Sequence, residues 1–291
     1  MTVPPPKLDK VSRSALAARL TALRVAAGLS GNALAKRMGI IQSRQWKIEH
    51  GELLPTEEDI RAWVRAIGER QEVAAELIDL LADARVEYQT FKAAYRKGGG
   101  GAAYQEQVRD IEERSTRIGE FQVAMIPAIL QTADYARESL SLPSGPAAWG
   151  SDSADIETMI DGRLRRQEIL HDPNKRIQVV LGEAALRTLV CTPETLAGQL
   201  SKLQSVIRLP ALELGIIGFS QPMPVFPFTA FSVRDDDLIV IERLTGEQYL
   251  RTEERPEEVA SFLKFFDLLR EAASTGTKAE AIIERALESL R

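Results

Sequence analysis

The side chains that could catalyse a reaction are few in this 291-residue chain and poorly spaced for it. Cys191 is the only cysteine, and with His171 and Asp172 it could in principle form a thiol nucleophile and its base. It follows an apolar Leu-Val pair, however, which favours a packed core position. Neither His50 nor His171 has a His or Cys partner at metal-ligand spacing. We therefore expect a protein that is not an enzyme, with no catalytic residue, no metal and no cofactor.

Carboxylate and glycine clusters have simpler explanations than catalysis. The pairs Glu253-Glu254 and Glu257-Glu258 look like solvated faces. Asp235 to Asp237 could bind a cation, but their place between two strand-like segments favours a hairpin turn. Gly98 to Gly101 could suggest a phosphate-binding loop, yet no Gly-Lys-Ser/Thr follows. Four consecutive glycines instead predict a hinge between domains.

The stretch from Leu29 to Gly51 predicts two short helices joined by a tight turn. Ser30 can cap the first helix, and Gly39 can end it because a left-handed residue is cheap only without a Cβ. The second helix is expected from Gln42 to Glu49. This arrangement is typical of a helix-turn-helix, whose second helix enters the DNA major groove. An ordinary helical hairpin within a larger bundle has the same spacing and remains an alternative.

The charges are distributed unevenly along the chain. The whole chain carries −5, whereas Lys7 to Leu54 holds nine Lys and Arg against three acids, or +6, which leaves −11 for the rest. A basic head on an acidic body fits a DNA-binding domain carried by a domain that does not bind DNA. Chance clustering of charge is the alternative.

Three further helices and an arm complete the predicted N-terminal domain. Residues 1–10 contain three prolines and are expected to form a flexible arm. Apolar positions spaced near 3.6 predict helices over residues 12–27, 57–67 and 71–96. Thr56 is placed to cap the helix that begins at Glu57, where Glu57, Glu58 and Asp59 meet the positive end of the helix dipole.

The detailed string closely resembles the phage-repressor-like (XRE) helix-turn-helix family. The matching residues are Gly28-Leu29-Ser30, Leu34-Ala35, Gly39-Ile40, Ile48-Glu49, Gly51 and Pro55. The resemblance implies that DNA bases are contacted by Gln42, Ser43, Arg44 and Lys47. It implies phosphate contacts from Ser30, Gly31, Asn32 and His50. It also implies a structural ion pair between Arg24 and Glu49 that locks the first helix against the reading helix.

The chain departs from this family at two places. Gln45-Trp46 replaces an apolar-small pair, so that Trp46 either packs against a thymine methyl group or covers the flank of the helix. Glu52-Leu53-Leu54 replaces a loop that is commonly basic, which should weaken phosphate contacts and flatten the salt dependence of binding.

The second half of the chain predicts a mixture of helices and strands. Strands are expected over residues 176–181, 212–217, 228–233 and 238–243, and helices over 104–118, 183–189, 195–207, 256–271 and 279–290. The last helix carries an apolar stripe that could either form a dimer surface or dock on its own domain. Five apolar side chains, Phe219, Met223, Phe226, Phe228 and Phe231, could line a ligand-sensing pocket or pack as core beneath a loop.

The segment Ile126-Pro127-Ala128-Ile129-Leu130-Gln131-Thr132-Ala133-Asp134-Tyr135-Ala136-Arg137 resembles the DUF5753 domain. Residues 163–170, 182–187 and 199–203 agree with the same pattern. One departure is Ala128, where the family usually has glycine. The resemblance implies an antitoxin-like actinobacterial regulator that pairs with a small DUF397-type partner protein.

The sequence therefore predicts an α+β protein. We expect an arm and five-helix DNA-binding domain at residues 1–97, a glycine-rich hinge at 98–103, and a regulatory and dimerisation domain at 104–291. The expected function is sequence-specific transcription regulation, by a cytoplasmic, nucleoid-associated homodimer that binds double-stranded operator DNA and no membrane. A small partner protein or a ligand could control it. The alternative is an antitoxin-type interaction module whose DNA binding is secondary.

Overall fold

The computed structural model describes residues 11–84, 87–91, 100–146, 151–227 and 229–290. The chain divides into two compact units, Met1–Tyr88 and Gln89–Arg291. The expected arm at residues 1–10 lies outside the described residues. None of the helices in the described part is both long and apolar enough to cross a membrane.

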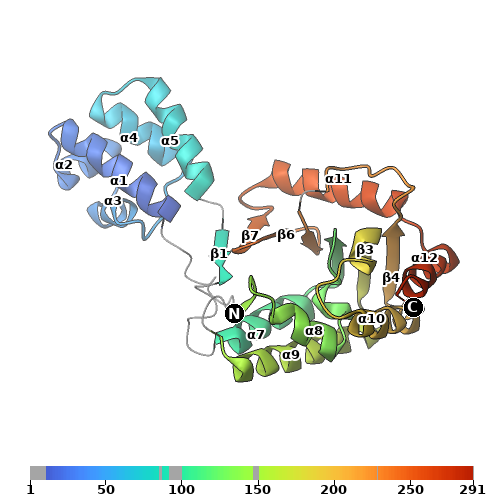
Figure 1. The fold of residues 1–291 in the computed structure, drawn as a ribbon. Coiled ribbons are helices and arrows are strands. Elements are labelled where there is room, and N and C mark those ends of the chain that lie inside the picture. The colour runs from blue at the N-terminus through green and yellow to red at the C-terminus, as the bar shows by residue number, and fades with distance from the viewer. Residues whose placement is uncertain (1–10, 85–86, 92–99, 147–150, 228, 291) are drawn as a thin grey trace. The chain divides into compact units, whose positions relative to one another are not determined.

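The first unit is a bundle of five helices, whose arrangement Figure 1 shows. They are α1 (Val11–Ala26), α2 (Gly31–Met38), α3 (Gln42–Glu49), α4 (Glu57–Ile67) and α5 (Gln71–Ala84). Their apolar faces meet in one core, which includes Leu20, Leu34, Ile48, Trp63 and Leu77. The helix predicted over 71–96 ends earlier, at Ala84, and a short strand, β1 (Glu87–Thr90), follows it.

The predicted caps of the first unit are confirmed. The Ser30 hydroxyl accepts the N–H of Ala33, and Gly39 ends α2 in the left-handed region with φ 72°. Thr56 and Asp59 form a reciprocal capping box at the start of α4. These local hydrogen bonds set the bounds of both helices, because the first N–H groups of a helix have no partner within it.

The second unit is built on a mixed sheet with the strand order β1-β7-β6-β5-β2-β3-β4. Its strands after β1 are β2 (Arg117–Gln122), β3 (Arg176–Gly182), β4 (Leu212–Ile217), β5 (Phe231–Arg234), β6 (Leu238–Arg243) and β7 (Gly246–Arg251). β2, β3 and β4 pair in parallel, whereas β5, β6 and β7 continue the sheet from β2 as antiparallel strands. Figure 1 shows α11 (Pro256–Ala272) on one side of this sheet and the other long helices opposite it.

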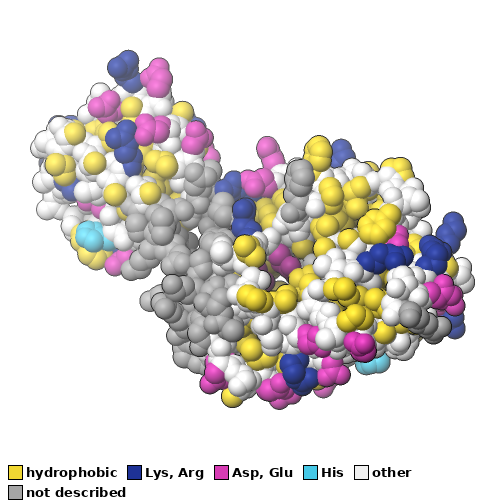
Figure 2. Space-filling model, viewed as in Figure 1, with side chains coloured by type: hydrophobic (Ala, Val, Ile, Leu, Met, Phe, Trp, Pro, Cys, Tyr) yellow, Lys and Arg dark blue, Asp and Glu magenta, His cyan; other side chains and the backbone are white. Residues whose placement is uncertain are grey.

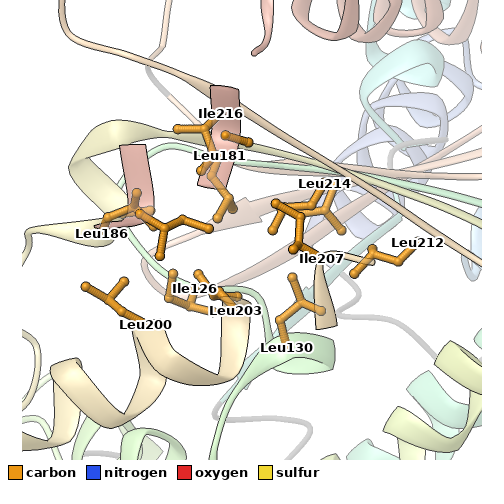
Figure 3. Close-up of a cluster of buried hydrophobic side chains, with 14 of the residues drawn as sticks. Ile126, Leu130, Leu181, Leu186, Leu200, Leu203, Ile207, Leu212, Leu214 and Ile216 are labelled. Carbon is orange, nitrogen blue, oxygen red and sulfur yellow. The ribbon is translucent and has the colours of Figure 1, made fainter. Parts of the chain in front are cut away.

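Those other helices are α7 (Gly100–Arg114), α8 (Ala133–Leu140), α9 (Ser153–Arg166), α10 (Pro193–Val206) and α12 (Gly276–Glu288). Short 3-10 turns lie at η1 (Ala128–Leu130), η3 (Gln167–His171) and η4 (Glu183–Leu186). The largest apolar core joins β3 and β4 to α10 and α12, and Figure 3 shows Leu181, Leu214 and Ile216 meeting Leu200 and Leu203 there. A second core lies between the opposite sheet face and α11.

Strand alternation divides the sheet into an apolar face and a partly polar face. On β2, Phe121 belongs to the core under α11, so its neighbours Glu120 and Gln122 point to the opposite face. On β6, Ile239 and Ile241 are in the same core, which places Glu242 on the opposite face with Glu120. This half of the sheet therefore presents polar side chains towards the side that carries α7 and α9.

Several predicted elements of the second half are confirmed and others are wrong. β3, β4, β6, α10 and α11 lie where the pattern places them, and Asp235 and Asp236 turn the β5–β6 hairpin with φ 49° and 59°. The helix predicted over 104–118 stops at Arg114, because β2 begins at Arg117. β2 and β7 were not predicted, since each carries polar residues on both sides of its alternation.

The predicted hinge at 98–103 is wrong in its second part. Gly98 and Gly99 lie outside the described residues, but Gly100 and Gly101 form the first turn of α7. Gly101 is buried where α7 meets α9, and a Cβ there would lie 2.3 Å from the Sδ of Met159. The division between the units falls earlier, between Tyr88 and Gln89. The missing side chain of Gly101 thus allows two helices to pack closely.

Candidate nucleic-acid interface

An ion pair fixes α3 against α1. Arg24 donates from Nε to Oε1 of Glu49 at 2.5 Å and from Nη2 to Oε2 at 3.1 Å. Its third nitrogen donates to the backbone oxygen of Leu29 at 2.7 Å, just before α2 begins. The pair expected from the XRE resemblance is therefore present, and it ties together α1, α3 and the residue before the cap of α2.

The inner side of α3 also contacts α2 through a polar side chain. Ile48 is buried in the helical core, and Gln45 is 1% exposed. A Cβ on Gly31 would lie 2.8 Å from Oε1 of Gln45, so the two helices approach closely at this point. Gln45, which was noted as a departure from the family, thus faces inward and fills space that a glycine leaves open.

The outer side of α3 is polar and accessible. Gln42, Ser43 and Lys47 are exposed, as Trp46 and His50 are. These positions recur one helical turn apart, so they share one side of the helix. Of the four residues expected to contact bases, Gln42, Ser43 and Lys47 therefore lie together on a free surface.

Arg44 differs from the other expected base-contacting residues. Its Nη2 donates to Oδ2 of Asp59 at 2.8 Å, which ties α3 to the start of α4. Burial alone would raise the pKa of Asp59, but hydrogen bonds from Arg44 and Thr56 outweigh it and hold this pKa below its usual value. In this structure, Arg44 serves the packing of the domain.

Trp46 covers the flank of the helix together with His50. Their rings stack with centroids 4.0 Å apart and planes 23° apart. Nδ1 of His50 also lies 2.8 Å from the backbone oxygen of Trp46. This stack places Trp46 on the flank of α3, as one of its two expected roles has it, and contact with a thymine methyl group stays a prediction.

The start of α2 lies at the surface and fits an anion. Ser30 and Asn32 are exposed and Gly31 is half-buried. Unpaired N–H groups at a helix start, together with its positive dipole end, favour a phosphate oxygen. Figure 2 shows Asp and Glu beside Lys and Arg on the face of the first unit that carries α4 and α5. In the segment from Lys7 to Leu54, by contrast, basic residues outnumber acidic ones.

Comparison with known families agrees with both parts of the chain. A helix-turn-helix domain model matches residues 15–77, and the model described as a domain of unknown function, DUF5753, matches residues 105–285. The chain belongs to the DUF5753 family. Its helix-turn-helix domain makes it a DNA-binding regulator, and DNA is its partner. A search of curated proteins gave no match.

The DUF5753 motif around Gln131 holds a buried loop in place. Gln131 donates from Nε2 to the oxygen of Ile126 at 2.7 Å and accepts from Arg163 at 2.6 Å. Gln199, which is fully buried, accepts the N–H of Thr132 at 2.7 Å. The motif segments at 126–137, 163–170 and 199–203 therefore meet each other, which explains their residue types by packing.

Ala128 is compatible with its place in this DUF5753 loop. It begins the 3-10 turn η1 after Pro127, and among the described residues other than glycine only Asp235 and Asp236 have positive φ. A Cβ is therefore tolerated where the family usually has glycine.

The structure decides between the alternatives for two features of the DUF5753 half, the five apolar side chains and the apolar stripe on α12. Phe231 lies in the core under α11, while Phe219 and Phe226 are 68% and 83% exposed and Met223 packs partly against that core. These four do not form a pocket together, and Phe228 lies outside the described residues. The stripe on α12 docks on its own domain, where Ala279, Ile282, Ile283 and Ala286 are buried.

Cys191 lies against the apolar core of the DUF5753 domain. Burial, with a smaller contribution from Glu138, raises the pKa of its thiol to about 11. A thiol with this pKa is protonated at neutral pH, so it is a weak nucleophile.

Asp235, which the sequence offered as a possible cation ligand, has a structural role instead. Its carboxylate accepts the N–H groups of Thr116 and Arg117, both at 2.8 Å, and so holds the start of β2.

Proposed function

We propose that this protein is a sequence-specific transcription regulator that reads operator DNA with α3. The observation that carries the proposal is the contrast between the two sides of this helix. Its inner side is held by the Arg24–Glu49 pair, and its outer side offers Gln42, Ser43 and Lys47 to solvent. Glutamine can form two hydrogen bonds with adenine, and lysine prefers O6 and N7 of guanine.

Phosphate contacts complete the proposed interface. We assign them to Ser30, Gly31 and Asn32 at the start of α2 and to His50 at the end of α3. Backbone contacts of this kind fix the register of a helix in the groove but carry no base specificity. Arg44 joins the base contacts only if it leaves Asp59, so we assign it a smaller share of the readout.

The regulator is proposed to act as a homodimer without enzymatic activity or a cofactor. One helix-turn-helix reads one half-site, so useful affinity normally requires two. Because the α12 stripe is buried within its own domain, we propose that the dimer contact lies on another surface of the second unit. By resemblance, we place it in the cytoplasm with the nucleoid, as an antitoxin-like regulator controlled by a DUF397-type protein or a ligand.

Selection of bound fragments from a random DNA pool tests the proposal. We expect the full chain to enrich one sequence arranged as two half-sites, with binding that weakens as salt rises. The competing function is a protein-interaction module whose DNA binding is secondary. Recovery of unenriched DNA, bound equally well by all sequences, would favour that module and reject sequence-specific reading.

A further inference from the structure

A cavity of about 730 Å³ lies inside the second unit, beside the polar part of the sheet. Side chains of β2, β5, β6 and β7 form one wall, and α7 and α9 contribute another. Its aromatic lining includes Phe91, Tyr104 and Tyr249, and its acidic lining is Glu120, Glu242 and Glu247. This volume is in the range of cavities that hold small organic ligands.

Strand register brings the three carboxylates together. Glu242 pairs directly with Glu247 across β6 and β7. Glu120 is joined to Tyr249 by a row of cross-strand neighbours that runs through Ser232 and Val240. Since all of these positions share the sheet face opposite α11, their side chains point to the cavity side.

The carboxylates have few partners for their charge. The Nε2 of Gln122 donates to Glu120 at 3.3 Å and to Glu242 at 2.8 Å, so one amide serves both groups. Glu247 accepts from the hydroxyls of Tyr104 and Tyr249. Among the described residues, no Lys or Arg forms an ion pair with Glu120, Glu242 or Glu247.

Four arginines also line the cavity, and each has a partner other than Glu120, Glu242 and Glu247: Arg163 donates to Gln131 and Arg243 donates to Gln248. Arg166 donates to both oxygens of the buried Glu112, at 2.6 and 2.7 Å, and Arg234 lies 3.6 Å from the same carboxylate. Glu120 is 8% exposed, and its second oxygen accepts no hydrogen bond within the described part of the chain. Glu120 therefore faces the cavity from a nearly buried position without an ion pair of its own, although the charges of Arg234 and Arg166 still favour its ionised form.

The surroundings of these groups shift their pKa values. Burial raises the pKa of Glu120 in spite of Arg234. The residue Glu242 is exposed, but loss of water around its carboxylate, followed by repulsion from Glu120 and Glu247, raises its pKa to about 8, against weaker lowering by Gln122 and Arg163. A bound positive group would relieve this repulsion and supply the missing hydrogen-bond donors.

We propose that the cavity binds an organic cation, in which an ammonium or guanidinium group sits between Glu120 and Glu242. The aromatic side chains Phe91, Tyr104 and Tyr249 would contact the body of this molecule, where aromatic faces also attract positive charge. The ligand class rests on the cavity alone. Its role as an effector rests on the proposed regulatory function, and the experiment separates these two statements.

Calorimetric titration of the full chain tests the ligand class. The probes are tyramine and spermidine, and the matched control is 4-(2-hydroxyethyl)phenol, which replaces the ammonium of tyramine with a neutral hydroxyl. We expect at least one amine to bind at least tenfold more tightly than the neutral control. We also expect at least tenfold tighter binding at pH 9 than at pH 6, with protons released near pH 7, because the ligand binds the ionised form of Glu242.

Variants provide a second readout. Glu120→Gln and Glu242→Gln keep the side-chain shape but remove charge, and each should weaken amine binding at least tenfold. Glu168→Gln, an exposed residue outside the cavity lining, should not change it. If neither amine binds better than the neutral control in the unmodified protein, the carboxylates share a proton without a ligand and the proposal is overturned. The proposal would also be overturned if both cavity variants bound the amine as tightly as the unmodified protein does.

DNA binding is measured separately, by fluorescence anisotropy of a selected fragment with and without the amine. A change in DNA affinity would support an effector role. Amine binding with unchanged DNA affinity would keep the ligand site and reject only its regulatory role. Failure of DNA binding itself would count against the proposed function and leave the calorimetric result standing.

Discussion

Arg24 and Glu49 face each other across α1 and α3 with two parallel hydrogen bonds, and their side chains are only 15% and 8% exposed. Bidentate hydrogen bonds of this kind fix the relative orientation of the two side chains and are strengthened by their opposite charges. If one side chain is truncated, the other remains as an unpaired charge that is largely shielded from solvent. The pair is therefore a test of how the reading helix is held.

Glu49→Ala should lower the free energy of unfolding by about 3 kcal/mol, because Arg24 is left as a nearly buried, unpaired charge. Urea unfolding of the full chain, followed by circular dichroism, measures this change. Glu52→Ala is the control, since Glu52 is exposed close by in the sequence and should change stability by less than about 0.5 kcal/mol. Equal effects of the two substitutions would show that the ion pair contributes little.

Gln42→Ala should weaken binding to the best selected DNA site by about 1–3 kcal/mol and relax the preference at one base position. The reason is that Gln42 is exposed on the outer side of α3 and can form two hydrogen bonds with a base. Anisotropy titrations with selected and random DNA measure it, with Gln71→Ala on the outside of α5 as the control. Equal weakening on both DNAs would assign Gln42 to the backbone, and no weakening would remove α3 from the groove.

Stability should depend on pH through Glu242. Its pKa is about 8 in the folded chain and near 4.5 when unfolded, so the folded state holds the extra proton between these values. Stability should therefore fall as the pH rises from about 4.5 to 8 and level off above this range. Loss of water around the carboxylate is the largest cause of this raised pKa, repulsion from Glu120 and Glu247 adds to it, and Gln122 and Arg163 act against it.

Glu242→Gln should remove this part of the slope, whereas Glu168→Gln should leave it unchanged. Melting temperatures of the two variants between pH 5 and pH 9 provide the comparison. A slope that persists in full in Glu242→Gln would assign the titration to another group.

Gly101→Ala should destabilise the second unit by about 1–3 kcal/mol, because the new methyl group collides with Met159 at the α7–α9 contact. Gly198→Ala is a matched control within α10, where no atom lies within 4 Å of the added Cβ. This second change should stabilise the chain by about 0.5–1 kcal/mol, because alanine is the better helix former. Loss of stability in both variants would point to a general cost of replacing glycine.

Local sequence determined much of the helical framework. The hydroxyl of Ser30 lies three residues before the N–H that it accepts, and Thr56 and Asp59 satisfy each other across the same spacing. Gly39 and Gly68 end helices because the left-handed region suits a residue without a Cβ. Such signals depend on neighbours within one turn of the chain, so the sequence alone predicts them.

Family motifs determined where the second unit would lie but not what its residues do. Gln131, Arg163 and Gln199 were recognisable as parts of a pattern, and only the folded chain shows that two of its segments bond directly to one loop. Arg44 is a similar case. Its sequence position suggests a base contact, whereas α4 brings Asp59 within 2.8 Å of it.

Tertiary structure alone decided the cavity. Glu120, Glu242 and Glu247 belong to strands that pair across gaps of more than 100 residues as well as within one hairpin, and two of those strands were not predicted. A shift in register by one residue would turn each carboxylate to the opposite face. The same long-range packing buried the α12 stripe and separated Phe231 from Phe219 and Phe226, because burial depends on what the rest of the chain brings to each surface.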